Sequence, residues 1–219
     1  MTRYSKFLTM VAAVGSVAFL AGAASANMVT NPGFETGDFT GWSSYGTWYV
    51  SSNPNDVHSG TYGAVSSLTV SSGTTSTTYS GLYQNITDTS AAGEAFNASV
   101  WISTAATNGY SEAYLQVQFG GLSNGNPVTL AQDVSTMITA SNQPFTLVSL
   151  NNIVAPAGTL GMQIQGVVEG IGGLNATSSN TGYTRFDDFS LTPVPEPATI
   201  ALTAIGFAGL ALVSRRRRA

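Results

Sequence analysis

The strongest constraint on the fold of this chain is the alternation of apolar and polar residues with a period of two. Between residues 113 and 119, Ala, Leu, Val and Phe occupy every second position, and Tyr, Gln and Gln stand between them. The same alternation runs through 96–102 and 160–168, where Gln163 and Gln165 are predicted to point outward. A period of two places alternate side chains on opposite faces of a β-strand, whereas a helix repeats every 3.6 residues. Each segment is therefore predicted to be a strand with one buried face.

Further β-rich segments recur along residues 27–193, separated by clusters of Gly, Pro, Asn and Ser. They are 48–51, 62–70, 81–86, 145–150 and 184–191. Residues 71–80 include eight Ser or Thr, so a loop is predicted there rather than an edge strand. Many short strands with turn residues between them are typical of antiparallel sandwiches. We predict an all-β domain, a single jelly-roll β-sandwich of about eight or nine strands.

The N-terminal residues show the pattern of an export signal rather than that of a folded domain. Arg3 and Lys6 precede the apolar run 7–23, which is followed by Ala-Ser-Ala at 24–26. Charge, apolar core and small residues in this order are typical of a secretory signal peptide. We therefore predict that signal peptidase removes residues 1–26.

The C-terminal segment, 194–219, contains Pro-Glu-Pro at 195–197, an apolar run over 198–214 and four arginines at 215–218. As a helix, the apolar run would be about 25 Å long, slightly short of the ~30 Å hydrocarbon core, and long arginine side chains can make up the difference. Arginine clusters stay on the cytoplasmic side of a membrane. We predict a transmembrane helix at about 198–214, with residues 27–193 outside that membrane.

The charge of the body excludes several classes of partner. Residues 27–193 hold ten Asp or Glu against one basic residue, Arg185, which gives a formal charge of −9, and the chain has no Cys. Such a body repels the phosphates of nucleic acids and anionic lipid headgroups. A neutral ligand or a cation suits it better.

The order of the C-terminal parts is itself informative. It is set by Pro195, Glu196, Pro197, Arg215, Arg216, Arg217 and Arg218, on either side of the apolar run. It resembles the PEP-CTERM sorting signal of Gram-negative bacteria that produce exopolysaccharide. The resemblance implies processing by an exosortase near Pro-Glu-Pro, an inner-membrane anchored precursor, and delivery to the cell surface or extracellular matrix. A plain single-pass anchor is the alternative.

Three separated motifs in the body carry a second resemblance. Asn-Pro-Gly-Phe-Glu at 31–35 is followed by Gly-Trp at 41–42, His-Ser-Gly-Thr-Tyr stands at 58–62, and Phe-Asp-Asp-Phe-Ser-Leu ends the body at 186–191. In this order and spacing they are similar to the galactose-binding-like jelly rolls, in particular carbohydrate-binding modules of families four, nine and twenty-two. The resemblance covers essentially all of 27–193.

This resemblance implies a structural calcium ion where the first and last strands lie together. Its ligands would be the carboxylates of Glu35 and Asp187 and a backbone carbonyl near Gly60.

The residues give a related argument of their own. Alternation places Asp187 on the core face with Phe189 and Leu191, and a carboxylate at a core edge needs a cation or strong donors. Asp188 would then face solvent. In the alternative, Asp187 pairs with Arg185 or caps a turn.

The sequence offers no clear catalytic constellation. His58 is the one histidine, which excludes two-histidine metal sites, and it is predicted to order the His-Ser-Gly turn. Glycoside hydrolysis needs two carboxylates about 5 to 10 Å apart. Asp187 and Asp188 are predicted to point to opposite faces, whereas Glu112 and Glu169 stay open as a pair. We predict that the chain is not an enzyme.

Aromatic residues carry the signal for sugar binding, because planar rings beside amides and hydroxyls match the faces and edges of pyranoses. Trp42 is predicted to pack in the core, and Trp101 to face outward. The candidates for ligand contact, for each of which a structural role is the alternative, are Tyr45, Trp48, Tyr49, Tyr110 and Tyr114.

We therefore expect an exported β-sandwich that binds a neutral or cation-bridged extracellular polysaccharide. The alternative is a structural biofilm or matrix protein whose jelly roll mediates protein contacts without binding sugar. An exposed aromatic platform would favour the first function, and large apolar patches or filament-forming edges would favour the second.

Overall fold

The computed structural model describes residues 25–70, 77–87, 92–105, 111–140, 142–171 and 180–195. Almost all of the predicted signal peptide, the predicted transmembrane helix, Tyr110 and the sorting residues from Glu196 onward lie outside these ranges. Within them, no helix is long and apolar enough to span a bilayer. Asn27–Pro193 forms one compact unit.

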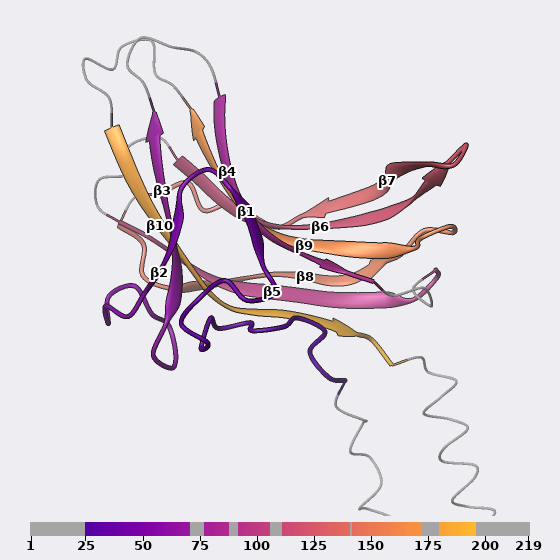
Figure 1. Cartoon of the computed structure of the whole chain (residues 1–219), viewed down its shortest axis with the longest axis horizontal. Coiled ribbons are helices and arrows are strands. Elements are labelled where there is room, and N and C mark those ends of the chain that lie inside the picture. Colours follow the sequence, from indigo (N-terminus) through magenta and orange to yellow (C-terminus); the bar gives the residue numbers. More distant parts are fainter. Residues whose placement is uncertain are drawn as a thin grey trace, which may run out of the picture. The chain divides into compact units, whose positions relative to one another are not determined.

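The described part of this unit contains ten strands in two antiparallel sheets of five (Figure 1). Sheet A has the order β1-β4-β9-β6-β7, and sheet B has the order β2-β3-β10-β5-β8. The strands are β1 (Ser43–Tyr45), β2 (Trp48–Ser51), β3 (Gly63–Val70), β4 (Thr77–Ile86), β5 (Ala95–Thr104), β6 (Ser111–Ser123), β7 (Asn126–Val134), β8 (Thr146–Val154), β9 (Gly161–Ile171) and β10 (Asn180–Pro193). The predicted all-β jelly-roll sandwich is confirmed.

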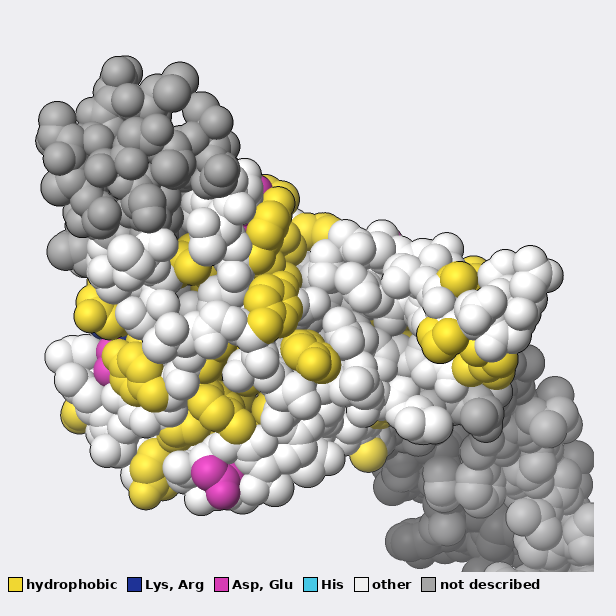
Figure 2. Space-filling view, turned by 45° about the horizontal axis from the view of Figure 1, so that its top comes forward, with side chains coloured by type: hydrophobic (Ala, Val, Ile, Leu, Met, Phe, Trp, Pro, Cys, Tyr) yellow, Lys and Arg dark blue, Asp and Glu magenta, His cyan; other side chains and the backbone are white. Residues whose placement is uncertain are grey.

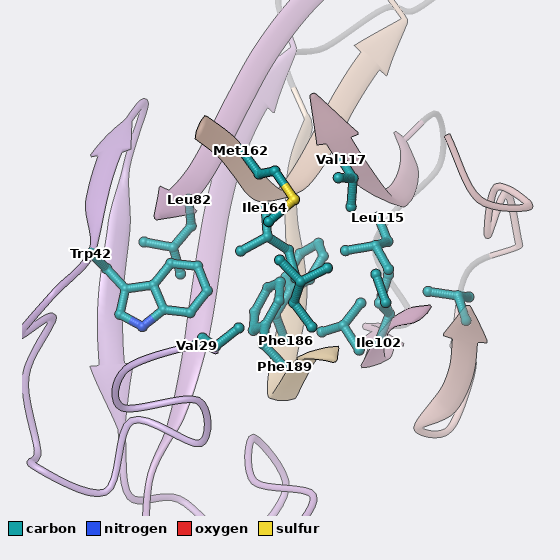
Figure 3. Close-up of a cluster of buried hydrophobic side chains, with 14 of the residues drawn as sticks. Val29, Trp42, Leu82, Ile102, Leu115, Val117, Met162, Ile164, Phe186 and Phe189 are labelled. Carbon is teal, nitrogen blue, oxygen red and sulfur yellow. The ribbon is translucent and has the colours of Figure 1, made fainter. Parts of the chain in front are cut away.

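The core lies between the two sheets, as alternation requires. Leu82 and Ile164 of sheet A face Ile102 and Phe186 of sheet B, and all four are fully buried (Figure 3). The predicted inward faces of β5 and β6 are confirmed, because each of these side chains is buried. They are Phe96, Ala98, Val100, Ile102, Ala113, Leu115, Val117 and Phe119.

The sequence analysis missed two strands and misplaced the start of a third. β1 has only three residues, and β7 is an edge strand that is exposed along most of its length, so neither shows clear alternation. Residues 77–80, predicted to be part of a loop, belong to β4 and pair with β9. Hydroxyl-rich segments lack an apolar pattern but can still form a ladder when their backbone groups find a partner strand, which is β9 here.

A β-bulge in β10 overturns the prediction for Asp187. Asp187 pairs with Trp101 and Ser190 with Ser99, so three steps along β10 match two along β5. The extra residue brings both Phe186 and Phe189 into the core, and Asp187 is turned to the outer side of sheet B. Asp187 therefore does not share the core face with Phe189.

The N-terminal segment lies along the same part of β10. Met28 N–H donates to the Leu191 carbonyl at 2.9 Å, and Phe189 N–H donates to the Pro32 carbonyl at 3.0 Å. Phe34 then packs its ring edge-on against Phe189, with 6.1 Å between the ring centroids. The first and last segments of the domain are thus held together by backbone and core contacts.

The close approach of β9 to these rings gives a test of the core. A Cβ atom at Gly166 would lie only 2.8 Å from Phe186 Cδ1, so glycine lets β10 pack directly on β9.

We expect Phe189→Ala to lower the free energy of unfolding by about 3–5 kcal/mol, measured by urea denaturation. The control is Val154→Ala, because Val154 is 54% exposed and should change stability by less than about 0.5 kcal/mol. Equal effects of the two changes would contradict this account of the core.

Candidate functional site

The outer face of sheet A carries four tyrosines from three of its strands, β1, β4 and β6. They project from the positions between buried residues, as the inward Leu82 and Leu115 show for β4 and β6. We call this surface the tyrosine face; its rings are those of Tyr45, Tyr79, Tyr83 and Tyr114. Figure 2 shows hydrophobic side chains gathered in bands among mostly uncharged side chains, with a few Asp or Glu and no Lys or Arg in view.

Tyr45 is held against the sheet by two contacts. Its ring lies over Gly81, where a Cβ atom would come within 2.4 Å of Cε1 and Cζ. Its hydroxyl accepts a hydrogen bond from Gln165 Nε2 at 2.7 Å. The ring of Tyr83 lies beside it, with 6.5 Å between the centroids. Tyr45 is nevertheless 41% exposed, so it is a fixed aromatic surface that is open to solvent.

Side-chain amides fill the middle of the tyrosine face. Gln116 stands directly opposite Gln165, and Gln118 opposite Gln163, across the β6–β9 pair. Gln118 Nε2 donates to Gln116 Oε1 at 3.0 Å, and Gln163 Nε2 donates to Asn85 Oδ1 at 2.9 Å. A hollow of about 240 Å³ opens beside this row, lined in part by Asn85, Gln118 and Gln163. The amides thus border a recess that is large enough for part of a sugar ring.

One end of the tyrosine face is acidic. Tyr79 donates its hydroxyl to Glu169 Oε1 at 3.2 Å, and Glu112 stands directly opposite Glu169 in the register of β6 and β9. Burial, followed by the nearby charge of Glu169, raises the pKa of Tyr114 to about 12. The two carboxylates that sequence reasoning left open as a pair are therefore cross-strand neighbours.

The predicted ligand-contact residues do not all lie on this face. Tyr45 and Tyr114 do, but Trp48 packs on Phe186 of the core, with 5.5 Å between the ring centroids. Tyr49 lies on the outer side of sheet B and is 42% exposed. The residues that sequence reasoning missed are Tyr79 and Tyr83, although alternation within β4 could have found them.

The outer side of sheet B carries a second cluster, built by residues 52–62, which we call the clamp loop. Asp187 Oδ2 accepts the N–H groups of His58 and Ser59 at 2.8 and 3.2 Å. Asp188 Oδ2 lies 2.7 Å from His58 Nδ1, and its Oδ1 accepts the Ser59 hydroxyl at 2.9 Å. Glu35 accepts the N–H groups of Thr61 and Tyr62. The clamp loop is thus fixed by three carboxylates.

Aromatic and ionic contacts complete the attachment of the clamp loop. The ring of His58 stacks on Trp101, with 3.9 Å between the centroids, so Trp101 faces outward as predicted and His58 orders its turn. Arg185 pairs with Asp56 rather than with Asp187, and both side chains are mostly buried. Asp187 therefore caps a turn, which was one of the alternatives for it.

The carboxylates of Asp187 and Asp188 and the methylene of Glu35 come close to Gly33 beneath the clamp loop. A Cβ atom there would lie 3.1 Å from Asp188 Oδ1, 3.4 Å from Asp187 Oδ1 and 3.9 Å from Glu35 Cγ. Gly60 lies against the Glu35 carboxylate, since its own Cβ would be 2.3 Å from Oε1. The structure thus brings together the three residues predicted for calcium.

The present partners of these carboxylates are protein donors. In the described residues, no group of three or more Asp, Glu, His or Cys side chains is arranged to hold a metal ion. Asp187 Oδ1 accepts only the Asp188 N–H at 2.8 Å, so it keeps capacity for a further ligand. Calcium at this site stays a prediction.

Two family models match different parts of the chain. Residues 26–146, more than half of the chain, match the family model of the carbohydrate binding domain of the CBM4/9 type. The chain belongs to this family. Residues 193–218 match the PEP-CTERM protein-sorting motif, which implies an exported, membrane-anchored precursor processed by an exosortase in a Gram-negative bacterium. No curated protein sequence matches the chain.

Solved structures share the fold at low sequence identity. The C-terminal family 22 carbohydrate-binding module of Clostridium thermocellum xylanase 10B has a TM-score of 0.52 and 14% identity, over 77% of this chain and 96% of that one. The N-terminal CBM22-1 and GH10 modules of the same xylanase, complexed with xylohexaose, have a TM-score of 0.51 and 20% identity, over 77% and 29%. The enzymatically active domain of bacteriophage CBA120 tailspike protein 4 has a TM-score of 0.51 and 17% identity, over 77% and 21%. The chain spans less than a third of the last two proteins.

Burial of Asp187 gives the clamp loop a pH dependence. Desolvation raises the pKa of Asp187 to about 6, although the hydrogen bonds from the His58 and Ser59 N–H groups act to lower this pKa. Between about pH 4 and pH 6 the folded protein then binds more protons than the unfolded chain, so this contribution to stability falls as pH rises.

We expect the wild type to lose up to about 3 kcal/mol relative to Asp187→Asn between about pH 4 and pH 7. The measurement is urea unfolding of both proteins in chelator, with Glu94→Gln as a charge-matched control. Parallel pH profiles of the wild type and Asp187→Asn would show that Asp187 does not titrate in this range.

Proposed function

We propose that this chain is a non-catalytic polysaccharide-binding protein of the cell surface or extracellular matrix, and that the tyrosine face holds the glycan. The family supports carbohydrate binding, and the sorting motif supports export. The residues that would contact sugar differ in part from those expected from the sequence, because Trp48 and Tyr49 lie elsewhere.

The fixed ring of Tyr45 is the observation that carries this proposal. An aromatic ring that is held by Gly81 and Gln165 loses little conformational freedom when a ligand stacks on it. The apolar face of a pyranose fits such a ring, and the sugar hydroxyls can exchange hydrogen bonds with the partly exposed amides of Gln118 and Gln163, which line the hollow. The tyrosine face therefore combines the two kinds of contact that a neutral sugar offers.

The chain offers a matched pair of tyrosines for the test. Tyr45 and Tyr49 are equally exposed, but they lie on the outer sides of different sheets. We expect Tyr45→Ala to weaken binding of a matrix polysaccharide at least tenfold in isothermal titration, and Tyr49→Ala to leave it within about twofold. Equal losses in both variants would remove the tyrosine face from the proposal.

We also propose that calcium binds beside Gly33 and stabilises the attachment of the clamp loop. Calcium prefers carboxylate and carbonyl oxygens; the carboxylates of Asp187 and Asp188 lie beside Gly33, and that of Glu35 lies against the neighbouring Gly60. The expected result is a higher melting temperature in millimolar calcium than in chelator, and loss of this difference in Glu35→Gln. Magnesium, which demands a tighter octahedral site, is the control ion. Identical melting curves in all three conditions would refute calcium binding.

A second candidate function, contact between proteins in a biofilm matrix, has an observation of its own. Leu122, Leu130 and Leu160 are exposed near the β6–β7 hairpin, beside a hollow of about 410 Å³ lined by residues such as Pro127 and Val128. β7 is also an edge strand of sheet A. Exposed apolar side chains at a sheet edge favour association. If no glycan binds, concentration-dependent assembly that is lost in Leu122→Ser would favour this function.

A further inference from the structure

The acidic end of the tyrosine face holds two like charges side by side. Glu112 and Glu169 are directly opposite each other on β6 and β9, where Cβ atoms of an antiparallel pair lie about 4.5–5.5 Å apart. Both side chains are partly exposed, and within the described residues neither forms an ion pair. Like charges in this position destabilise a sheet. A cation between them would convert this repulsion into attraction.

A buried hydroxyl without a partner lies at the same place. Tyr114 follows Glu112 on the same face of β6 and is only 7% exposed. Its hydroxyl forms no hydrogen bond in the described part of the chain, although both carboxylates are near enough for their charge to raise its pKa. Buried hydroxyls in native proteins almost always have a partner. The unsatisfied Tyr114 hydroxyl therefore points to a ligand beside the two glutamates.

The protein does not supply the missing cation itself. Arg185 is the one basic side chain in the described residues, and it is bound to Asp56 on the outer side of sheet B. A bare calcium ion fits poorly, because it needs six to eight oxygens, and the side chains described here offer two carboxylates and the hydroxyls of Tyr79 and Tyr114. A monovalent ammonium needs only a few acceptors, and it also binds favourably over tyrosine rings.

We propose that Glu112, Glu169 and Tyr114 form a subsite for the ammonium group of an amino sugar within the bound glycan. This inference rests on the proposed function of the tyrosine face, and it narrows the ligand to a glycan with free amino groups. The ammonium donates hydrogen bonds to both carboxylates and to the Tyr114 oxygen, while neighbouring sugar rings lie toward Tyr45. Tyr79 holds Glu169 in place through its hydroxyl.

The test compares three hexasaccharides on the purified full chain, kept in a neutral detergent without sugar headgroups. They are the glucosamine hexamer, the N-acetylglucosamine hexamer and xylohexaose, titrated at about pH 6, where the amines are charged. We expect the glucosamine hexamer to bind at least tenfold more tightly than the other two. The preference should decrease as salt is added, because it depends on charge.

Charge-removing variants separate the subsite from general attraction to an acidic protein. Glu112→Gln and Glu169→Gln should each weaken binding of the glucosamine hexamer about tenfold and leave xylohexaose binding unchanged. Glu94→Gln removes the same charge ahead of β5, away from the tyrosine face, and should have little effect on either ligand. Tyr114→Phe, which keeps the ring, should weaken only the glucosamine hexamer.

The possible negative results lead to different conclusions about the subsite and about the proposed function. If xylohexaose and the glucosamine hexamer bind equally well and depend on Tyr45, the amino-sugar subsite is refuted and glycan binding by the tyrosine face stands. If Glu94→Gln weakens the glucosamine hexamer as much as Glu112→Gln does, the attraction is non-specific and the subsite is again refuted. If none of the three hexasaccharides binds, both the subsite and the proposed function fail for these sugars.

Discussion

The bulge in β10 is the constraint on which most of this structure depends. One extra residue between Asp187 and Ser190 places Phe186 and Phe189 on the same face of the strand, although they are three residues apart. Asp188 adopts a left-handed backbone conformation with a φ of 51°, which costs a non-glycine residue about 1 kcal/mol. The hydrogen bonds of Asp187 and Asp188 to the clamp loop offset this cost. The bulge therefore allows β10 to contact the core on one side and the clamp loop on the other.

The two outer faces of the sandwich differ because the clamp loop is attached to sheet B only. On sheet B the clamp loop covers Trp101 and Asp187, so that side serves stability. On sheet A the rings of Tyr45 and Tyr79 are 41% and 49% exposed, whereas Tyr114, Gln116 and Gln165 are buried. The carboxylates are divided in the same way. Glu35 and Asp187 accept backbone N–H groups and Asp188 contacts the side chains of His58 and Ser59, whereas Glu112 and Glu169 face each other on the tyrosine face.

The sequence was sufficient for the fold class and for the core faces of the long strands. Alternation identified β5 and β6 because one side of each strand is fully buried, and that burial leaves a pattern. It could not identify β7, whose residues are exposed on both faces at a sheet edge. It also misjudged Asp187, because a bulge shifts the alternation by one residue without leaving a signal in the side chains.

The binding face was only partly predictable for a related reason. Tyr45 and Trp48 are three residues apart, yet the chain crosses from sheet A to sheet B between them. The crossing occurs at Gly46, which has a φ of 80° and would place a Cβ atom 2.4 Å from Ser80 Oγ. Nearness in sequence suggested one aromatic group, but strand pairing separates these residues onto different sheets. Pairing between distant strands also joins Glu112 to Glu169, and periodicity carries no information about it.

The position of β10 has a mechanical consequence for a protein that is held by its C-terminal end. β10 is flanked by β3 and β5, and beyond the part that pairs with β3 the N-terminal segment at Met28 hydrogen-bonds to Leu191. A force applied at Pro193 and directed along β10 would load this strand lengthwise. Backbone bonds of an antiparallel ladder run perpendicular to the strands, so such a force shears many of them together instead of peeling them one by one. A force of this kind would thus be shared among the hydrogen bonds on both edges of β10.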